Sequence, residues 1–230
     1  MPSILLHQWE MSPFCNKVRR CLSYKGLKYE VRDYNGLLAR KAAALTPAGQ
    51  LPVLDYDGER LQDSARIVEF LERRHPDKPL LPKDPQALVL AHIWEDWSGK
   101  SLYFYQVYFR MLDPVSMERA LDLVCKGRPR WERSVLKFAF NRRYPSKLRW
   151  QGVARQPRPE VERQFFGLLG DLDTWVSARP WLAGEALSVA DLSAAGMISE
   201  LLRTSDLAPR VLALPHLKAW LSRCDQAAPA

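Results

Sequence analysis

A serine and a cysteine three residues apart are the residues best placed to do chemistry. The segment reads Ser12-Pro13-Phe14-Cys15 and lies where a strand pattern gives way to a helix pattern. Unpaired amides at a helix N-terminus favour anions. A thiol placed there acquires a lowered pKa, and a hydroxyl there can donate a hydrogen bond that keeps another molecule's thiolate ionised. The plainer alternative is that Ser12 only caps the helix and Cys15 is a small buried residue.

Two further segments could hold a ligand through the backbone or a helix end. In Leu51-Pro52-Val53 a proline precedes a predicted strand, which is compatible with a cis bond that turns the chain. Such a turn can leave the next residue's amide and carbonyl free to pair with an extended peptide. Asp63-Ser64 begins a predicted helix. A plain loop proline and a plain helix cap remain the alternatives.

The elements that position these segments alternate between strand and helix over residues 1–75. Apolar runs, turn residues and helix signals predict the order β-α-β-α-β-β-α. The Asp57-Gly58 pair indicates a hairpin, and Gly26 ends the first helix. The predicted elements are strand 3–9, helix 12–26, strand 28–32, a weak helix 37–45, hairpin 53–62 and a helix from residue 64.

The remainder of the chain is predicted to be helical. Prolines at positions 76, 79, 82 and 85 mark a linker over residues 76–85, because proline interrupts helices. Residues 86–230 show helical periodicity, including a long helix from about 88 to 111. Ser188 and Asp191 form a predicted capping box. The expected architecture is therefore an α/β domain followed by an all-α domain.

The net charge is concentrated in one segment. The chain has 34 Lys and Arg against 26 Asp and Glu, a net +8. Residues 126–158 contain eleven basic residues and one acidic residue, Glu132. Trp131, Val135 and Phe138 have the spacing of a buried helix face, while three prolines at 145, 157 and 159 indicate much loop. The segment could be solvated surface, a rim that attracts anionic substrates, or a site for a macromolecular anion. No nucleic-acid motif accompanies it, so we do not expect nucleic acid as a partner.

The cysteines and apolar runs exclude other classes. Cys15, Cys21, Cys125 and Cys224 lack the spacing of a zinc site, so we expect no metal. Their scatter and the lack of a leader pattern predict free thiols in a cytoplasmic protein. No apolar run approaches the roughly 18 residues of a membrane helix.

In order and spacing, these motifs resemble the glutathione S-transferase superfamily, in its serine- or cysteine-type classes. The resemblance spans the whole chain and rests on Ser12-Pro-Phe-Cys15, Gln50-Leu-Pro-Val53, Asp63-Ser64, the proline-rich linker and the Ser188–Asp191 box. It implies a thioredoxin-like glutathione-binding domain at 1–75, a linker at 76–85 and a helical co-substrate domain at 86–230. It also implies a homodimer.

The resemblance assigns roles to particular residues. Ser12 would activate the glutathione thiol for attack on a small electrophile, with Cys15 as the alternative catalytic residue. Pro52 would be a cis-proline, and Val53 would pair with the cysteinyl part of glutathione. Asp63 and Ser64 would bind the γ-glutamyl group. The full set of implied glutathione contacts is Phe14, Gln50, Leu51, Pro52, Val53, Asp63 and Ser64.

Departures from the pattern keep other functions open. Ser12 replaces the first cysteine of the dithiol motif found in glutaredoxin-like proteins, and a serine cannot attack a disulfide. One alternative is a non-catalytic binding or regulatory protein with this fold, and another is a thiol reductase or lyase that uses Cys15. The aromatic run that contains Tyr103 and Tyr105 could line a co-substrate pocket or pack in the core.

Overall fold

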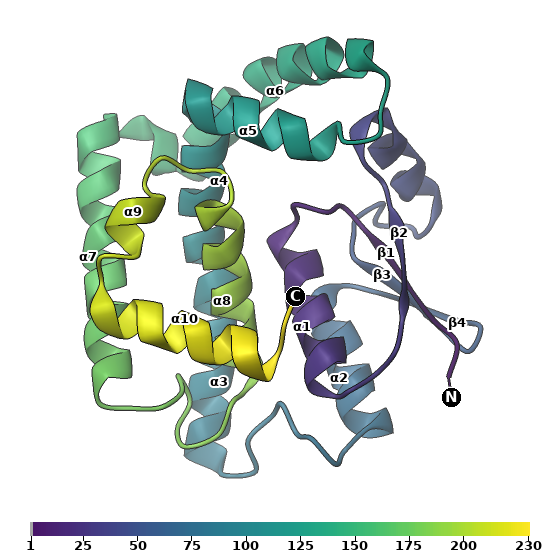
Figure 1. Ribbon diagram of the computed structural model, residues 1–230, viewed down its shortest axis with the longest axis vertical. Helices are drawn as coiled ribbons and strands as arrows, with labels where there is room; N and C mark the ends of the chain where they lie inside the picture. The colour runs from purple at the N-terminus through teal and green to yellow at the C-terminus, as the bar shows by residue number, and fades with distance from the viewer. Residues whose placement is uncertain (1) are drawn as a thin grey trace.

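A computed structural model describes residues 2–230, and its N-terminal part is a four-stranded mixed sheet (Figure 1). The strands are β1 (Ile4–Gln8), β2 (Glu30–Asp33), β3 (Val53–Tyr56) and β4 (Glu59–Gln62), in the order β2-β1-β3-β4. β1 is parallel to β2 and antiparallel to β3, and β3 pairs with β4 as the predicted hairpin.

Three helical segments follow strands of this sheet. α1 (Pro13–Tyr24) follows β1, the 3-10 helix η1 (Gly36–Ala44) follows β2, and α2 (Ser64–Arg74) follows β4. Val18 and Leu22 on α1 and Ile67 and Leu71 on α2 are fully buried, as the i, i+4 spacing of apolar residues predicts. The predicted β-α-β-α-β-β-α order is confirmed.

The C-terminal part is entirely helical over the described residues apart from an isolated bridge between Trp181 and Gly184. α3 (Pro85–Trp97) continues through a π turn, η2 (Ser98–Leu102), into α4 (Tyr103–Leu112), which matches the predicted long helix. The other helical segments are α5 (Pro114–Val124), α6 (Arg130–Gln151), η3 (Val153–Arg155), α7 (Arg158–Ser177), α8 (Val189–Leu202), α9 (Ala208–Val211) and α10 (Pro215–Ala227).

The two parts meet where α1 packs against α8. A Cβ at Gly196 of α8 would lie 3.1 Å from the carbonyl oxygen of Pro13, so the helices approach closely there. Asn16 Nδ2 donates to Glu200 Oε1 at 3.0 Å. The predicted capping box begins α8, and Asp191 also accepts from Trp220 Nε1 at 2.9 Å. These contacts fix the N-terminus of α1 relative to the helical domain.

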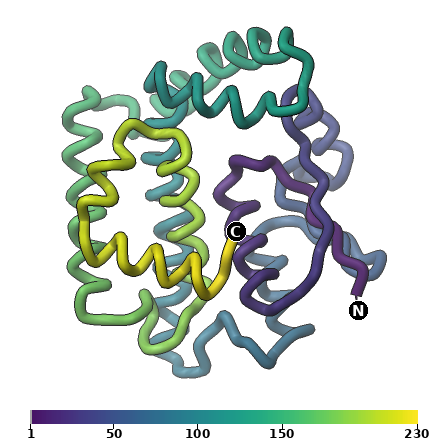
Figure 2. The backbone as a smooth tube through the Cα atoms, viewed as in Figure 1, coloured from purple at the N-terminus to yellow at the C-terminus, as the bar shows by residue number. Residues whose placement is uncertain are grey.

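The basic segment forms a long helix, so the prediction that much of it is loop was wrong. α6 runs through Pro145 without a break, and α5 and α6 cross above both parts of the molecule in the tube view (Figure 2). Pro145 is exposed and removes one helical hydrogen bond, a cost that a long helix can absorb. Pro157 precedes α7 and Pro159 lies in its first turn, where proline is well tolerated.

The predicted buried face of this helix was also wrong. Trp131, Val135 and Phe138 are 60%, 41% and 70% exposed. Leu136 and Leu148, on other sides of the helix, are buried instead. The spacing of the apolar residues indicated a helix correctly but did not indicate which face the protein covers.

Candidate functional site

The N-terminus of α1 presents the Ser12 hydroxyl. Ser12 is the N-cap residue, and its Oγ accepts a hydrogen bond from the Cys15 amide at 3.4 Å. Pro13 follows as the first helical residue, where its lack of an amide proton costs nothing. Since the Oγ acts as an acceptor in the cap, its own proton can be donated to a ligand.

Cys15 lies in a different environment from Ser12. Its side chain is fully buried, and burial raises the pKa of the thiol to about 11 although the hydrogen bond with Ser12 acts in the opposite direction. The thiol therefore remains protonated near neutral pH and out of contact with solvent. The structure gives Cys15 the properties of a core residue.

A small cavity of about 110 Å³ brings most of the expected glutathione contacts together. The Leu51–Pro52 bond is cis, as the resemblance implied. Asp63 adopts a φ of 76° and caps α2 through Oδ1, which accepts from the amides of Ala65 and Arg66. The lining residues are Phe14, Gln50, Leu51, Pro52, Gln62, Asp63 and Ser64.

Val53 is the expected contact that does not line this cavity. It is fully buried and pairs with His7 on one side and with Gln62 on the other. Leu51, on the other side of the cis-proline, faces the cavity instead. Leu51 is therefore the residue next to the cis-proline that lines both cavities, and the contact with Val53 stays a prediction.

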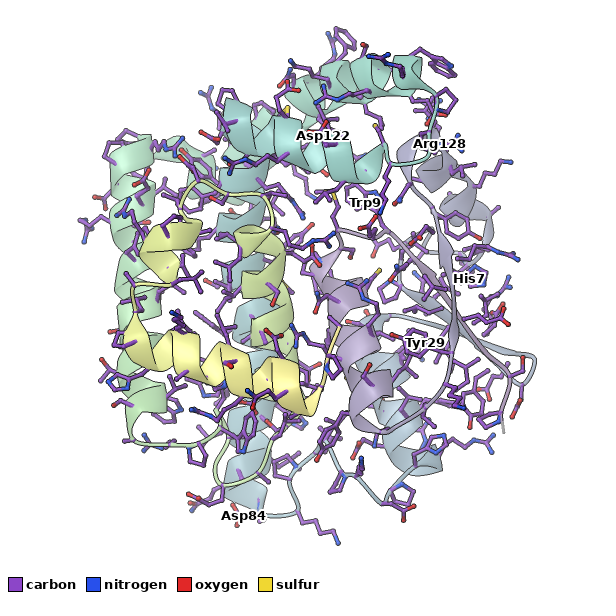
Figure 3. All side chains as sticks on the ribbon, viewed as in Figure 1. His7, Trp9, Tyr29, Asp84, Asp122 and Arg128 are labelled. Carbon is purple, nitrogen blue, oxygen red and sulfur yellow. The ribbon has the colours of Figure 1, made fainter. Side chains whose placement is uncertain are left out.

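A larger cavity of about 440 Å³ adjoins the small one and shares Phe14, Gln50 and Leu51 with it. Ser12 lines this larger cavity together with residues of α4 and α6. Its lining residues are Trp9, Ser12, Pro13, Phe14, Ala39, Ala42, Gly49, Gln50, Leu51, Tyr103, Arg110, Arg143, Tyr144 and Lys147. Figure 3 labels Trp9 in the loop after β1 and Arg128 at the turn that leads into α6.

Sequence reasoning missed four polar residues that line this cavity. Arg110 comes from α4, and Arg143, Tyr144 and Lys147 come from α6. For the residues of α6, the only sequence signal was the basic composition of residues 126–158. That composition did not reveal which cations line a cavity. Of the aromatic run on α4, Tyr103 lines the cavity and stacks near Phe14 with ring centroids 5.1 Å apart.

The rest of that aromatic run packs in the helical core. The Tyr105 ring lies 5.7 Å from Phe165, and the Phe109 ring lies 5.1 Å from Phe165. Both of the alternatives considered for the run are therefore present, at different residues of one helix.

Two classes of site do not occur in the described part of the chain. Within residues 2–230, no group of three or more His, Cys, Asp or Glu residues is arranged to hold a metal ion. Over the same range, no helix has both the length and the apolar character needed to cross a membrane.

Comparison with known families accounts for both parts of the structure. Residues 6–79 match the family described as "Glutathione S-transferase, N-terminal domain", and residues 135–226 match "Glutathione S-transferase, C-terminal domain". The chain belongs to the glutathione S-transferase superfamily. This confirms the resemblance and the predicted thioredoxin-like and all-helical architecture.

Individual relatives are more distant. A probable maleylacetoacetate isomerase of Caenorhabditis elegans is 38% identical over 87 residues, which cover 36% of this chain and 39% of the relative. A maleylacetoacetate isomerase of Dictyostelium discoideum is 26% identical over 152 residues, or 60% of this chain and 64% of the relative. The matched region thus spans less than two thirds of either relative. A glutathione S-transferase structure from Sinorhizobium meliloti aligns with a TM-score of 0.65 and 25% identity, covering 97% of this chain and 88% of that one.

Proposed function

We propose that this protein is a glutathione-dependent enzyme of the transferase type, in which Ser12 activates the glutathione thiol. The observation that carries the proposal is the continuity of the two cavities. They share Phe14, Gln50 and Leu51, and they place the Ser12 hydroxyl and the Asp63–Ser64 helix end along one surface. An extended tripeptide can reach from one to the other.

The small cavity suits the γ-glutamyl end of glutathione. Ser64 begins α2, a helix of 11 residues, and its hydroxyl and the helix N-terminus can bind the α-carboxylate. Both cap hydrogen bonds of Asp63 use Oδ1, so we expect Oδ2 to accept from the α-ammonium group. The backbone of Leu51, next to the cis-proline, suits the cysteinyl residue.

This arrangement places the sulfur near Ser12. A thiol has an ordinary pKa of about 8.5, and both the Ser12 O–H and the N-terminus of α1 stabilise its ionised form. The thiol proton passes to solvent, and the thiolate sulfur forms a bond to an electrophilic carbon held in the larger cavity. The electron pair displaced from that carbon leaves with the departing group or is protonated by water.

The burial of Cys15 and its raised pKa support Ser12 over the reductase or lyase alternative. The homodimer and the cytoplasmic location stay predictions. Val89 and Ile93 on α3 are 56% and 57% exposed and one helical turn apart, which provides apolar surface for self-association.

Thermal unfolding with reduced glutathione tests the proposal. Ligand at about tenfold over its Kd should raise Tm by roughly 3 °C. Ser64→Ala should lose most of this shift, whereas Ser222→Ala, a matched change on the exposed face of α10, should keep it. The absence of any shift at millimolar glutathione would contradict the proposal and favour a non-catalytic binding protein.

A further inference from the structure

The inner face of α6 carries two cations that point into the larger cavity. Arg143 and Lys147 are one helical turn apart and line it together with Tyr144. Arg142 and Arg149, on the same helix, do not line the cavity, although all four of these basic residues are exposed to solvent. The helix therefore divides its positive charge between an inner and an outer face.

Arg110 adds a third cation from α4. Its side chain is 2% exposed, and its Nη1 donates to the carbonyl oxygen of Met11 at 2.7 Å. Its Nε is buried and has no hydrogen-bond partner within residues 2–230. A buried guanidinium with an unused donor is costly unless an anion or another acceptor satisfies it.

Buried cations elsewhere in this protein, unlike Arg110, have carboxylate partners. Lys17 pairs with Glu95, Arg20 with Asp225 at 2.7 Å, and Lys25 with Glu72 at 2.6 Å. In the part of the chain that the structure describes, neither Arg110, Arg143 nor Lys147 forms an ion pair. The larger cavity thus brings together three cations that have no ion-pair partner among the described residues.

The electrostatics of the cavity agree with this geometry. Burial lowers the pKa of Lys147, and the neighbouring charge of Arg143 lowers it further. Burial also lowers the pKa of Arg110 below its ordinary value, although Tyr144 and Glu200 act in the opposite direction. An anion in the cavity would offset the loss of hydration that mainly causes these shifts, and it would reduce the repulsion between Arg143 and Lys147.

We propose that the larger cavity binds a co-substrate that carries a carboxylate, held by Arg110, Arg143 and Lys147. This inference rests on the proposed glutathione-dependent function. Guanidinium groups bind planar carboxylates through paired hydrogen bonds, and the hydroxyls of Tyr103 and Tyr144 can donate to the same group. The electrophilic carbon of such a molecule can then face Ser12, which lines the same cavity.

Two glutathione conjugates test the inference without requiring the natural substrate. One is S-(para-carboxybenzyl)glutathione. The other is S-(para-carbamoylbenzyl)glutathione, in which a neutral amide of nearly the same shape replaces the benzyl carboxylate. Their Kd values are measured by calorimetry, together with the Kd of reduced glutathione. We expect the wild-type protein to bind the carboxylate about tenfold more tightly than the amide at low salt.

Matched double variants locate the effect. In Arg143→Ala/Lys147→Ala the Kd values of the carboxylate and amide conjugates should differ by no more than about twofold. The Kd of reduced glutathione should stay the same. In Arg142→Ala/Arg149→Ala, which removes the same charge from the outer face of α6, the preference should remain. Arg110 is left unchanged because it also holds the Met11 carbonyl.

The other outcomes separate the two proposals. If glutathione binds but the carboxylate gives no preference, this inference is overturned and the proposed function stands. If Arg143→Ala/Lys147→Ala weakens reduced glutathione as much as the conjugate, the cations bind the glycyl carboxylate of glutathione, and the inference is again overturned. If neither glutathione nor either conjugate binds, both proposals fail.

Discussion

The two walls of the larger cavity hold a ligand by different physical means. The wall that contains Ser12, Gln50 and Leu51 offers a hydroxyl, a helix N-terminus and backbone at a cis-proline turn. The wall from α6 offers the charged side chains of Arg143 and Lys147. Backbone groups are fixed by the fold, whereas side chains on an exposed helix can be exchanged without refolding it. Thiol activation should therefore depend on the first wall and the choice of co-substrate on the second.

The largest expected effect separates the walls by chemistry. Ser12→Ala removes the hydrogen bond to the thiolate, so kcat with a chloronitrobenzene electrophile should fall about 100-fold, as when one transition-state donor is removed. The pKa of bound glutathione, followed by ultraviolet absorbance of the thiolate, should rise. Loss of the cap should destabilise the protein by only about 1 kcal/mol.

A serine on α6 provides the control for this change. Ser146 is exposed and lies on α6 outside the cavity lining. Ser146→Ala should therefore leave kcat and the pKa of the glutathione thiol unchanged. If Ser12→Ala kept kcat within twofold of wild type, the hydroxyl would have no role in catalysis.

The second prediction concerns the contact that holds α6 against the N-terminal domain. Glu132 of α6 is buried and accepts from the Leu37 amide at 2.8 Å. Gly36 has a φ of 61°, and a Cβ there would overlap Glu132 Oε2. Gly36→Ala should therefore lower the free energy of unfolding by about 1–3 kcal/mol and shift the α6 wall.

Gly26→Ala is the matched control, because Gly26 has a φ of 69° and no atom lies within 4 Å of the position that a Cβ would take there. Both variants should be less stable in chemical denaturation, but only Gly36→Ala should reduce the preference for a carboxylated conjugate. An equal preference in both variants would show that the contact does not position the cationic wall.

The two walls also differ in how far they could be predicted. The Ser12 wall depends on local signals, namely a cap followed by proline, a proline before a strand and a second cap at Asp63. The structure brings most of the residues predicted from these signals to the two cavities. At the cis-proline turn, Leu51 lines the small cavity and Val53 does not, although Val53 was the residue predicted to pair with the ligand. A difference of two positions along a turn decides which residue reaches the cavity.

The α6 wall depends on how a helix is rotated against the rest of the protein. Periodicity showed that Trp131, Val135 and Phe138 share a face, and the structure exposes that face. The rotation is fixed by distant contacts such as Glu132 with Leu37 and Trp9 with Phe140. Contacts between residues so far apart in the chain have no local sequence signature, so the inward position of Arg143 and Lys147 could not be predicted.

A smaller effect should appear in the pH dependence of the cationic wall. Lys147 must be protonated to attract a carboxylate, and its pKa is lowered by burial and by Arg143. The preference for the carboxylated conjugate should therefore decline by a factor of a few as pH rises through that lowered pKa, below the ordinary 10.5. Burial raises the pKa of Tyr103 and Tyr144, so these hydroxyls stay neutral over the lower part of this range.

Arg143→Ala removes one cause of the shift. In this variant the preference should be weaker, and its decline should move to higher pH, whereas in Arg142→Ala the midpoint should not move. Calorimetric titrations of both conjugates across the alkaline range measure the midpoint, because the ionisation of the shared glutathione part cancels in the ratio. An unchanged midpoint in Arg143→Ala would mean that Lys147 does not carry the effect.

The smallest expected change in activity tests the first wall again. Cys15→Ser removes a thiol that is buried and protonated near neutral pH, so kcat should stay within about twofold of wild type. Stability should fall by about 1 kcal/mol, because a hydroxyl is costlier to bury than a thiol. Loss of activity in Cys15→Ser together with an unaffected Ser12→Ala would assign the chemistry to the thiol and require α1 to open during turnover. Retained activity in Cys15→Ser, with activity lost in Ser12→Ala, would instead place the reacting sulfur on glutathione.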